Sequence, residues 1–85
     1  MKTKISNKKN VLVYGAGEAG RQLINSLETN PNYKVVGVLD DNVKLANKSL
    51  LGITIHSSSN LKKIIILKNV NLVFLAIPSI SRARR

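Results

Sequence analysis

The sequence predicts an α/β fold with a doubly wound parallel sheet, and three observations support this. Short apolar runs rich in β-branched residues recur along the chain, as in strands buried in a parallel sheet. Segments with apolar residues at helical spacing lie between these runs. A glycine-rich hexapeptide joins the first run to the first helical segment. We expect a basic tail over residues 1–9 and a single module over residues 10–85.

The first unit reads as a strand, a glycine turn and a helix. The apolar run 11–14 is followed by six residues that spell G-x-G-x-x-G, namely Gly15, Ala16, Gly17, Glu18, Ala19 and Gly20. The helical spacing then continues until Asn30 and Pro31. In such a turn Gly15 permits the bend, Gly17 lets a pyrophosphate approach, and Gly20 lets the helix pack on the strand. The helix N-terminus would supply N–H groups to the phosphates. This order is that of a Rossmann unit.

The later segments extend this unit into a partial Rossmann-like sheet. Further strands are predicted over residues 34–39, 51–56 and 71–77. A short helical turn is expected through Val43 and Ala46. The polar residues 57–60 precede helical spacing from Leu61, which predicts a crossover helix, although the β-branched run 64–67 also fits a strand. The expected strand order is 3-2-1-4, with the ligand where the order reverses.

Two further places along the chain are candidates for the same site. Asp40 ends the second strand about 20 residues after the glycine turn, where a Rossmann unit places the acid that binds a ribose. A carboxylate there repels a 2′-phosphate, which favours NAD over NADP. For Asp40 the other interpretation is a turn or cap, which we prefer for Asp41. Ile77 and Pro78 end the fourth strand and are also assigned to the site, against the alternative of a buried strand stopped by proline.

Composition excludes several classes of function. The chain has 85 residues and no cysteine, so it is one small domain without disulfides, thiolate nucleophiles or cysteine-based metal sites. No apolar run approaches the ~20 residues that span a bilayer, and we expect a cytoplasmic protein. No metal site and no serine triad is predicted, and the single histidine, His56, is expected at the surface or in a turn.

The net charge of +10 does not by itself predict nucleic-acid binding. Much of the positive charge lies near the two ends of the chain. Only three aromatic residues are present, and two of them lie within apolar runs, so base stacking has little support. We therefore expect no specific nucleic-acid partner.

Three segments in order, residues 11–23, 36–42 and 76–85, resemble the first Rossmann module of bacterial nucleoside-diphosphate-sugar epimerase/dehydratases of polysaccharide biosynthesis. This module is often described as CoA-binding-like. In that family it lies between N-terminal membrane helices and a C-terminal catalytic domain that typically dehydrates a UDP-N-acetylhexosamine. The resemblance implies a truncated module of such an enzyme.

The resemblance also sets expectations for ligands and partners. The Tyr-x-x-x-Lys signature of the catalytic domain fits neither Tyr14 nor Tyr33, so no catalytic residue is assigned and the chain is not expected to be an enzyme on its own. The expected ligand is NAD, with CoA and a UDP-sugar left open. The fourth strand would form an apolar edge, which predicts a homo-oligomer or a separate catalytic polypeptide. The alternative function is a non-catalytic interaction module or remnant.

Overall fold

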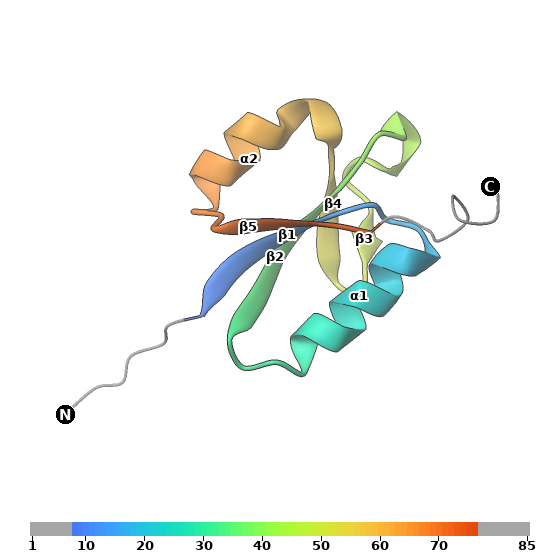
Figure 1. The fold of residues 1–85 in the computed structure, drawn as a ribbon. Helices are drawn as coiled ribbons and strands as arrows, with labels where there is room; N and C mark the ends of the chain where they lie inside the picture. Colours follow the sequence, from blue (N-terminus) through green and yellow to red (C-terminus); the bar gives the residue numbers. More distant parts are fainter. Residues whose placement is uncertain (1–7, 77–85) are drawn as a thin grey trace, which may run out of the picture.

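The computed structural model describes residues 8–76, which form a five-stranded sheet with a helix on each face (Figure 1). The elements in chain order are β1 (Lys9–Tyr14), α1 (Glu18–Glu28), β2 (Tyr33–Asp40), the 3-10 turn η1 (Val43–Leu45), β3 (Ser49–Leu50), β4 (Ile53–Ser57), the 3-10 turn η2 (Ser58–Asn60), α2 (Leu61–Leu67) and β5 (Leu72–Leu75). The predicted boundary after residue 9 falls one residue inside β1. The predicted α/β class is confirmed.

The sheet has the order β3-β4-β2-β1-β5. Its four parallel strands, β4, β2, β1 and β5, reproduce the predicted order 3-2-1-4. The short strand β3 was not predicted, and it pairs antiparallel with β4. Leu51 and Gly52 take φ values of 54° and 82° and turn the chain between these two strands. The strand predicted over residues 51–56 therefore begins two residues later in the structure, at Ile53.

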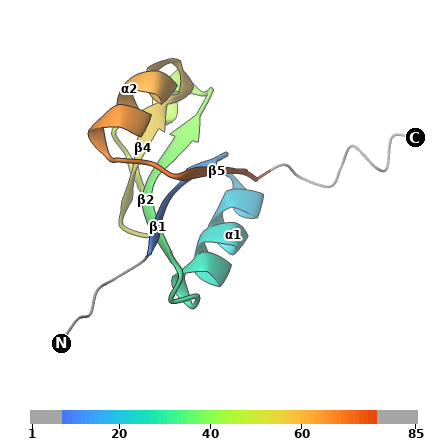
Figure 2. The ribbon, with the colours of Figure 1, turned by 60° about the vertical axis from the view of Figure 1, so that its left-hand side comes forward.

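The two helices lie on opposite faces of the sheet, as the turned view in Figure 2 shows. Each face has its own apolar cluster because successive side chains of a strand point to opposite faces. The cluster on the α1 face contains Val11, Val13, Ile24, Leu27, Val38 and Ile55. The cluster on the α2 face is smaller and contains Leu12, Leu39 and Ile64. Within residues 8–76, neither helix is long and apolar enough to cross a bilayer.

The run from Ile64 to Leu67, which fits a helix or a strand in isolation, is part of α2. This helix carries the chain from β4 across to β5, and parallel strands need such a crossover. Ile64 faces the sheet, whereas Ile66 and Leu67 are exposed. The polar residues before the helix form η2, where the Ser57 hydroxyl accepts a hydrogen bond from the Ser59 N–H at 3.3 Å. The need for a crossover therefore outweighs the local β-propensity.

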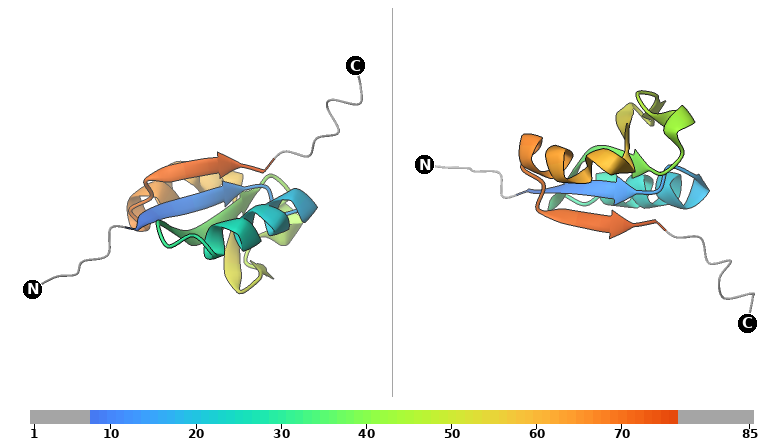
Figure 3. Two further views of the ribbon diagram at one scale, coloured as in Figure 1. Left: turned by 60° about the horizontal axis from the view of Figure 1, so that its bottom comes forward. Right: turned by 90° about the horizontal axis from the view of Figure 1, so that it is seen from above.

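Strand β5 forms one edge of the sheet, beside β1 (Figure 3). Its residues alternate between the two faces of the sheet. Leu72 and Phe74 pack on the α1 cluster. The Phe74 ring meets the Tyr33 ring edge-on at 5.7 Å. On the other face Leu75 is 63% exposed and Val73 37% exposed. The predicted apolar edge strand is thus present.

The prediction that His56 lies at the surface or in a turn is wrong. His56 is half-buried on β4, and its Nε2 atom is buried without a hydrogen-bond partner among the described residues. The ring lies over Gly37 of β2, where an added Cβ would come within 3.5 Å of the His56 Cδ2 atom. The alternation of β4 explains this position, since Ile55 points to the α1 face and its neighbour must point to the α2 face.

Candidate functional site

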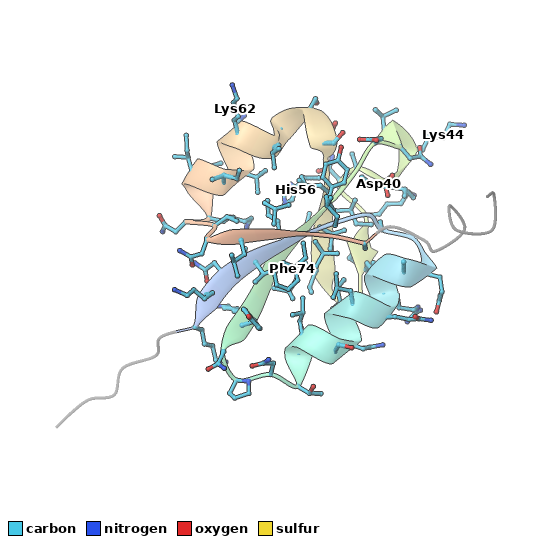
Figure 4. The ribbon with its side chains drawn as sticks, in the orientation of Figure 1. Asp40, Lys44, His56, Lys62 and Phe74 are labelled. Atoms are coloured by element: carbon cyan, nitrogen blue, oxygen red, sulfur yellow. The ribbon has the colours of Figure 1, made fainter. Side chains whose placement is uncertain are left out.

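Parallel pairing brings the carboxyl ends of β1, β2, β4 and β5 to one edge of the sheet. The turn Gly15–Gly20 leaves β1 at this edge, and Asp40 is the last residue of β2 (Figure 4). The structure thus brings together two of the three predicted parts of the site. Ile77 and Pro78 lie outside the described residues, and Ala76, which precedes them, contacts the turn.

Two of the three motif glycines are required by packing. Gly15 has a φ of +125°, and a Cβ there would lie 2.8 Å from the Ala76 carbonyl oxygen. A Cβ on Gly20 would lie 1.9 Å from the Gly15 carbonyl oxygen. Backbone hydrogen bonds hold the neighbouring chain, from the Gly15 N–H to the Leu39 carbonyl at 2.7 Å and from the Ala76 N–H to the Tyr14 carbonyl at 2.9 Å. The fold alone accounts for glycine at both positions.

Gly17 differs from the other two. Its φ of −81° and ψ of −158° suit any residue, and an added Cβ would meet nothing within 4 Å. Neither backbone strain nor packing therefore requires glycine here. The open space lies at the N-cap position of α1, directly before the first helical residue, Glu18. No pocket is found within residues 8–76, so this space is open surface.

The first turn of α1 presents backbone donors to this surface. The first hydrogen bond of the helix runs from the Arg21 N–H to the Gly17 carbonyl, at 3.0 Å. Helix geometry leaves the preceding N–H groups, those of Glu18, Ala19 and Gly20, without a carbonyl partner inside the helix. Gly17 offers no side chain to cap them. Unpaired donors and the positive end of the helix dipole together favour an anion at this position.

Two charged side chains flank these donors. Glu18 is exposed and lies 3.9 Å from Arg21, as measured between Oε1 and Nε. Gln22 also donates a hydrogen bond to the Glu18 carboxylate, at 3.4 Å. Both side chains of the ion pair are largely exposed, so it contributes little to stability. The Arg21 side chain is therefore only weakly held by Glu18.

Asp40 connects the end of β2 to the glycine turn. One carboxylate oxygen accepts a hydrogen bond from the Ala16 N–H at 2.8 Å, and the other accepts one from the Asn42 N–H at 2.8 Å. The first bond orients the turn, which sequence reasoning did not predict. A carboxylate has about four acceptor positions, so Asp40 retains room for further donors such as ribose hydroxyls. A turn-stabilising role and a binding role are both compatible with this geometry.

Asp41 has other partners, on the α2 face of the sheet. The Tyr14 hydroxyl donates a hydrogen bond to the Asp41 carboxylate at 2.6 Å. The Ser58 side chain is the other partner, and hydrogen bonds from Ser58 and Tyr14 lower the pKa of Asp41 below its ordinary value of 3.8. Tyr14 itself packs against the cluster that contains Leu12 and Leu39. We call this arrangement of Tyr14, Asp41 and Ser58 the acid bridge, because it joins the ends of β1 and β2 to the start of η2.

Sequence reasoning missed the acid bridge. The expectation that Asp41 only forms a turn or a cap does not include these side-chain contacts. Tyr14 at the end of a strand and two consecutive acids at the end of the next strand were visible in the sequence. Their contact depends on the register that pairs Tyr14 with Leu39, and spacing does not reveal this register.

These features define the class of the protein as a Rossmann-like module, with a glycine turn at the carboxyl edge of a parallel sheet. Residues 7–70 match the family described as C2185-like, N-terminal, and the chain belongs to this family. No curated protein matches the chain.

Solved structures agree with this assignment. The chain is similar to UDP-D-quinovosamine 4-dehydrogenase from Vibrio fischeri, with 37% identity and a TM-score of 0.76, over 80% of this chain and 56% of that one. The match thus spans only about half of the dehydrogenase chain. This similarity confirms the resemblance to the N-terminal Rossmann module of nucleoside-diphosphate-sugar enzymes. The Rex-family repressor RSP has the same fold at 19% identity and a TM-score of 0.77, over 85% of this chain and 35% of its own.

Proposed function

We propose that the chain is a nucleotide-binding module that holds an NAD-type dinucleotide and has no catalytic residues of its own. The pyrophosphate would lie at the N-terminus of α1, against the turn Gly15–Gly20. Asp40 would accept hydrogen bonds from the adenosine ribose. Ile77 and Pro78, which lie outside the described residues, stay assigned to the site on the sequence alone. Any catalysis would come from another polypeptide or domain, as in the nucleoside-diphosphate-sugar enzymes of polysaccharide biosynthesis.

The open space at Gly17 carries this proposal. If the glycine turn served the fold alone, a residue with a side chain would be acceptable at Gly17, since its backbone is ordinary and its surroundings are empty. A ligand phosphate against the backbone N–H groups explains why this position lacks a side chain. NADH is bound by RSP, which shares the fold at 19% identity, so this type of ligand is compatible with the fold.

The second candidate function is an interaction module, and the β5 edge favours it. All four residues of β5 are apolar, and Leu75 is largely exposed. Edge strands in soluble proteins usually carry a charge, a proline or a cover. The two functions are compatible, and only the first requires Gly17 to stay free of a side chain.

The test is a thermal melt of the 85-residue chain, followed by circular dichroism, with NAD, NADP, CoA or UDP-N-acetylglucosamine added separately. At 100 times its dissociation constant a ligand adds about 2.7 kcal/mol to the free energy of unfolding, a rise of roughly 10–20 °C in Tm for a domain of this size. NAD is expected to give the largest rise. No rise with any of the four compounds would overturn the proposal.

Two variants at one position separate ligand binding from folding. Asp and Asn are both good N-cap residues, so Gly17→Asp and Gly17→Asn should fold at least as well as the native chain. Both fill the space of the phosphate, and Gly17→Asp also repels it. We expect Gly17→Asn to weaken the NAD-induced rise in Tm and Gly17→Asp to abolish it. Ser26→Asp, on the exposed side of α1, is the control for an added charge. A native response to NAD in Gly17→Asp would contradict the proposed site.

A further inference from the structure

The acid bridge gives the module a second carboxylate beside Asp40, and the two carboxylates have different partners. Asp40 bonds to the backbone of the glycine turn and of Asn42. Asp41 bonds to side chains, those of Tyr14 and Ser58. Because Tyr14 is half-buried against Leu12 and Leu39, its hydroxyl fixes the position of an otherwise exposed carboxylate. The position of Asp41 is therefore determined by the fold.

We propose that Asp41, positioned by Tyr14, is a second determinant of dinucleotide choice and excludes a 2′-phosphorylated ribose. This inference rests on the proposed function, and it concerns a residue to which sequence reasoning gave only a turn role. Consecutive Cα atoms lie about 3.8 Å apart, so a group bound at Asp40 lies at a distance from Asp41 that is comparable with the screening length of ~8 Å. A 2′-phosphate would meet two negative charges there.

The nearby cation does not offset these charges. Lys44, on η1, is exposed, and its side chain extends away from Asp40 into solvent (Figure 4). The hydrogen bonds to Asp41 are also of the kind that keep a carboxylate ionised, which agrees with its lowered pKa. Asp41 thus carries its negative charge at neutral pH.

The experiment measures the dissociation constants of NAD and NADP by calorimetry for the native chain and for Asp41→Asn. The amide keeps the size of the side chain and removes its charge. We expect the affinity for NADP relative to NAD to rise about tenfold, as expected for one charge removed at this range in partly screened surroundings. The affinity for NAD itself should change by less than about threefold. Glu28→Gln, an exposed carboxylate at the far end of α1, is the control and should leave both constants unchanged.

Tyr14→Phe tests the positioning role. It removes one of the two side-chain hydrogen bonds to Asp41 and leaves the charge, so that Ser58 alone holds the carboxylate. The affinity for NADP relative to NAD should then rise by about threefold. In the double variant with Asp41→Asn, the tyrosine change should add nothing, because the two residues act through one contact. Salt dependence distinguishes an electrostatic role from a purely structural one. Added NaCl should raise the affinity for NADP relative to NAD more in the native chain than in Asp41→Asn, because salt screens the Asp41 charge.

The outcomes distinguish this inference from the proposed function. If the native chain binds NAD but Asp41→Asn leaves the affinity for NADP relative to NAD unchanged, the role of Asp41 is overturned. The proposed nucleotide-binding function would then still stand. Equal ratios in Tyr14→Phe and the native chain would overturn the positioning role of the tyrosine. Absence of binding of both nucleotides to the folded native chain would overturn the proposed function, and the selectivity inference with it.

Discussion

The two faces of the sheet are held together differently. On the α1 face an 11-residue helix buries Gly20, Ile24 and Leu27, and the last two belong to a cluster of six buried residues. On the α2 face a seven-residue helix buries one residue, Ile64, in a cluster of three. The glycine turn leads into α1, the helix that buries more residues against the sheet. A binding turn needs a rigid base, because small displacements of its N–H groups would weaken a bound phosphate.

Polar groups show the same difference. The α2 face contains the Tyr14 hydroxyl, which bonds to Asp41, and the buried His56 Nε2 atom, which has no hydrogen-bond partner within residues 8–76. On the α1 face no buried side-chain polar atom without a partner is found in the same residues. Both polar side chains come from strand positions that the alternation directs to the α2 side. We infer that the α1 face supplies most of the stability and the α2 face is the more sensitive to pH. The predictions below test this difference, from the largest expected effect to the smallest.

The largest effect is expected for Gly20→Ala on the α1 face. A Cβ there would lie 1.9 Å from the Gly15 carbonyl oxygen, a contact that only a shift of α1 or of the turn relieves. The free energy of unfolding expected for a chain of 85 residues is about 4–13 kcal/mol. We expect this variant to lose several kcal/mol of it and to be partly unfolded at 25 °C. Gly17→Ala, with no neighbour within 4 Å, should lose about 1 kcal/mol or less. Urea unfolding measures both, and similar losses would contradict the distinction between the two glycines.

The next effect compares one isoleucine from each helix. Ile24 is fully buried on the α1 face, and Ile64 is 5% exposed in the smaller cluster. Replacing a buried isoleucine with alanine destabilises by about 2–5 kcal/mol, depending on how well the surroundings close the cavity. We expect Ile24→Ala near the upper part of this range and Ile64→Ala near the lower. A larger loss for Ile64→Ala in the same urea measurement would show that the α2 face is the tighter one.

Much of the fold was predictable because its signals are local. Apolar runs predicted the parallel strands, and the glycine hexapeptide predicted the turn from β1 to α1. The existence of β3 was not predictable, since it depends on Leu51 adopting a left-handed conformation that leucine seldom takes. The start of β4 was misplaced for the same reason. Local pattern thus determined the central strands and failed at one edge.

The sequence identified the glycine turn and Asp40 as candidates for one site, and it did not show how they are connected. The spacing from the glycine turn identified Asp40, but the bond from the Ala16 N–H to its carboxylate depends on how β1 and β2 pair. Asp41 was given a turn or cap role because its contact with Tyr14 depends on the same pairing of β1 and β2. His56 was assigned to the surface or a turn, although the alternation of β4 places it on the α2 face.

The smallest predicted effect is the pH dependence of stability due to His56 on the α2 face. Burial lowers the pKa of the His56 imidazole below its ordinary value of 6.5, and the positive charge of Lys68 lowers it further. The unfolded chain therefore takes up a proton at a higher pH than the folded chain. The free energy of unfolding should decrease as the pH falls from about 6.5 to the folded pKa and should level off below it, with a slope of at most ~1.4 kcal/mol per pH unit. Hydrogen bonds from Ser58 and Tyr14 lower the pKa of Asp41 from 3.8, so its own loss of stability occurs at more acidic pH.

Two variants connect this pH dependence to the α2 face. His56→Leu places an apolar side chain over Gly37 and should remove the slope between pH 6.5 and the folded pKa, because it removes the group whose pKa burial lowers. Lys68→Gln removes the positive charge that lowers the pKa of His56, so the folded pKa should rise. The free energy of unfolding should then level off at a higher pH. The chain has one histidine, so its NMR titration gives the folded pKa directly, without assignment. A folded pKa at or above 6.5, or a slope that persists in His56→Leu, would show that the pH sensitivity comes from elsewhere and that the two faces do not differ in this respect.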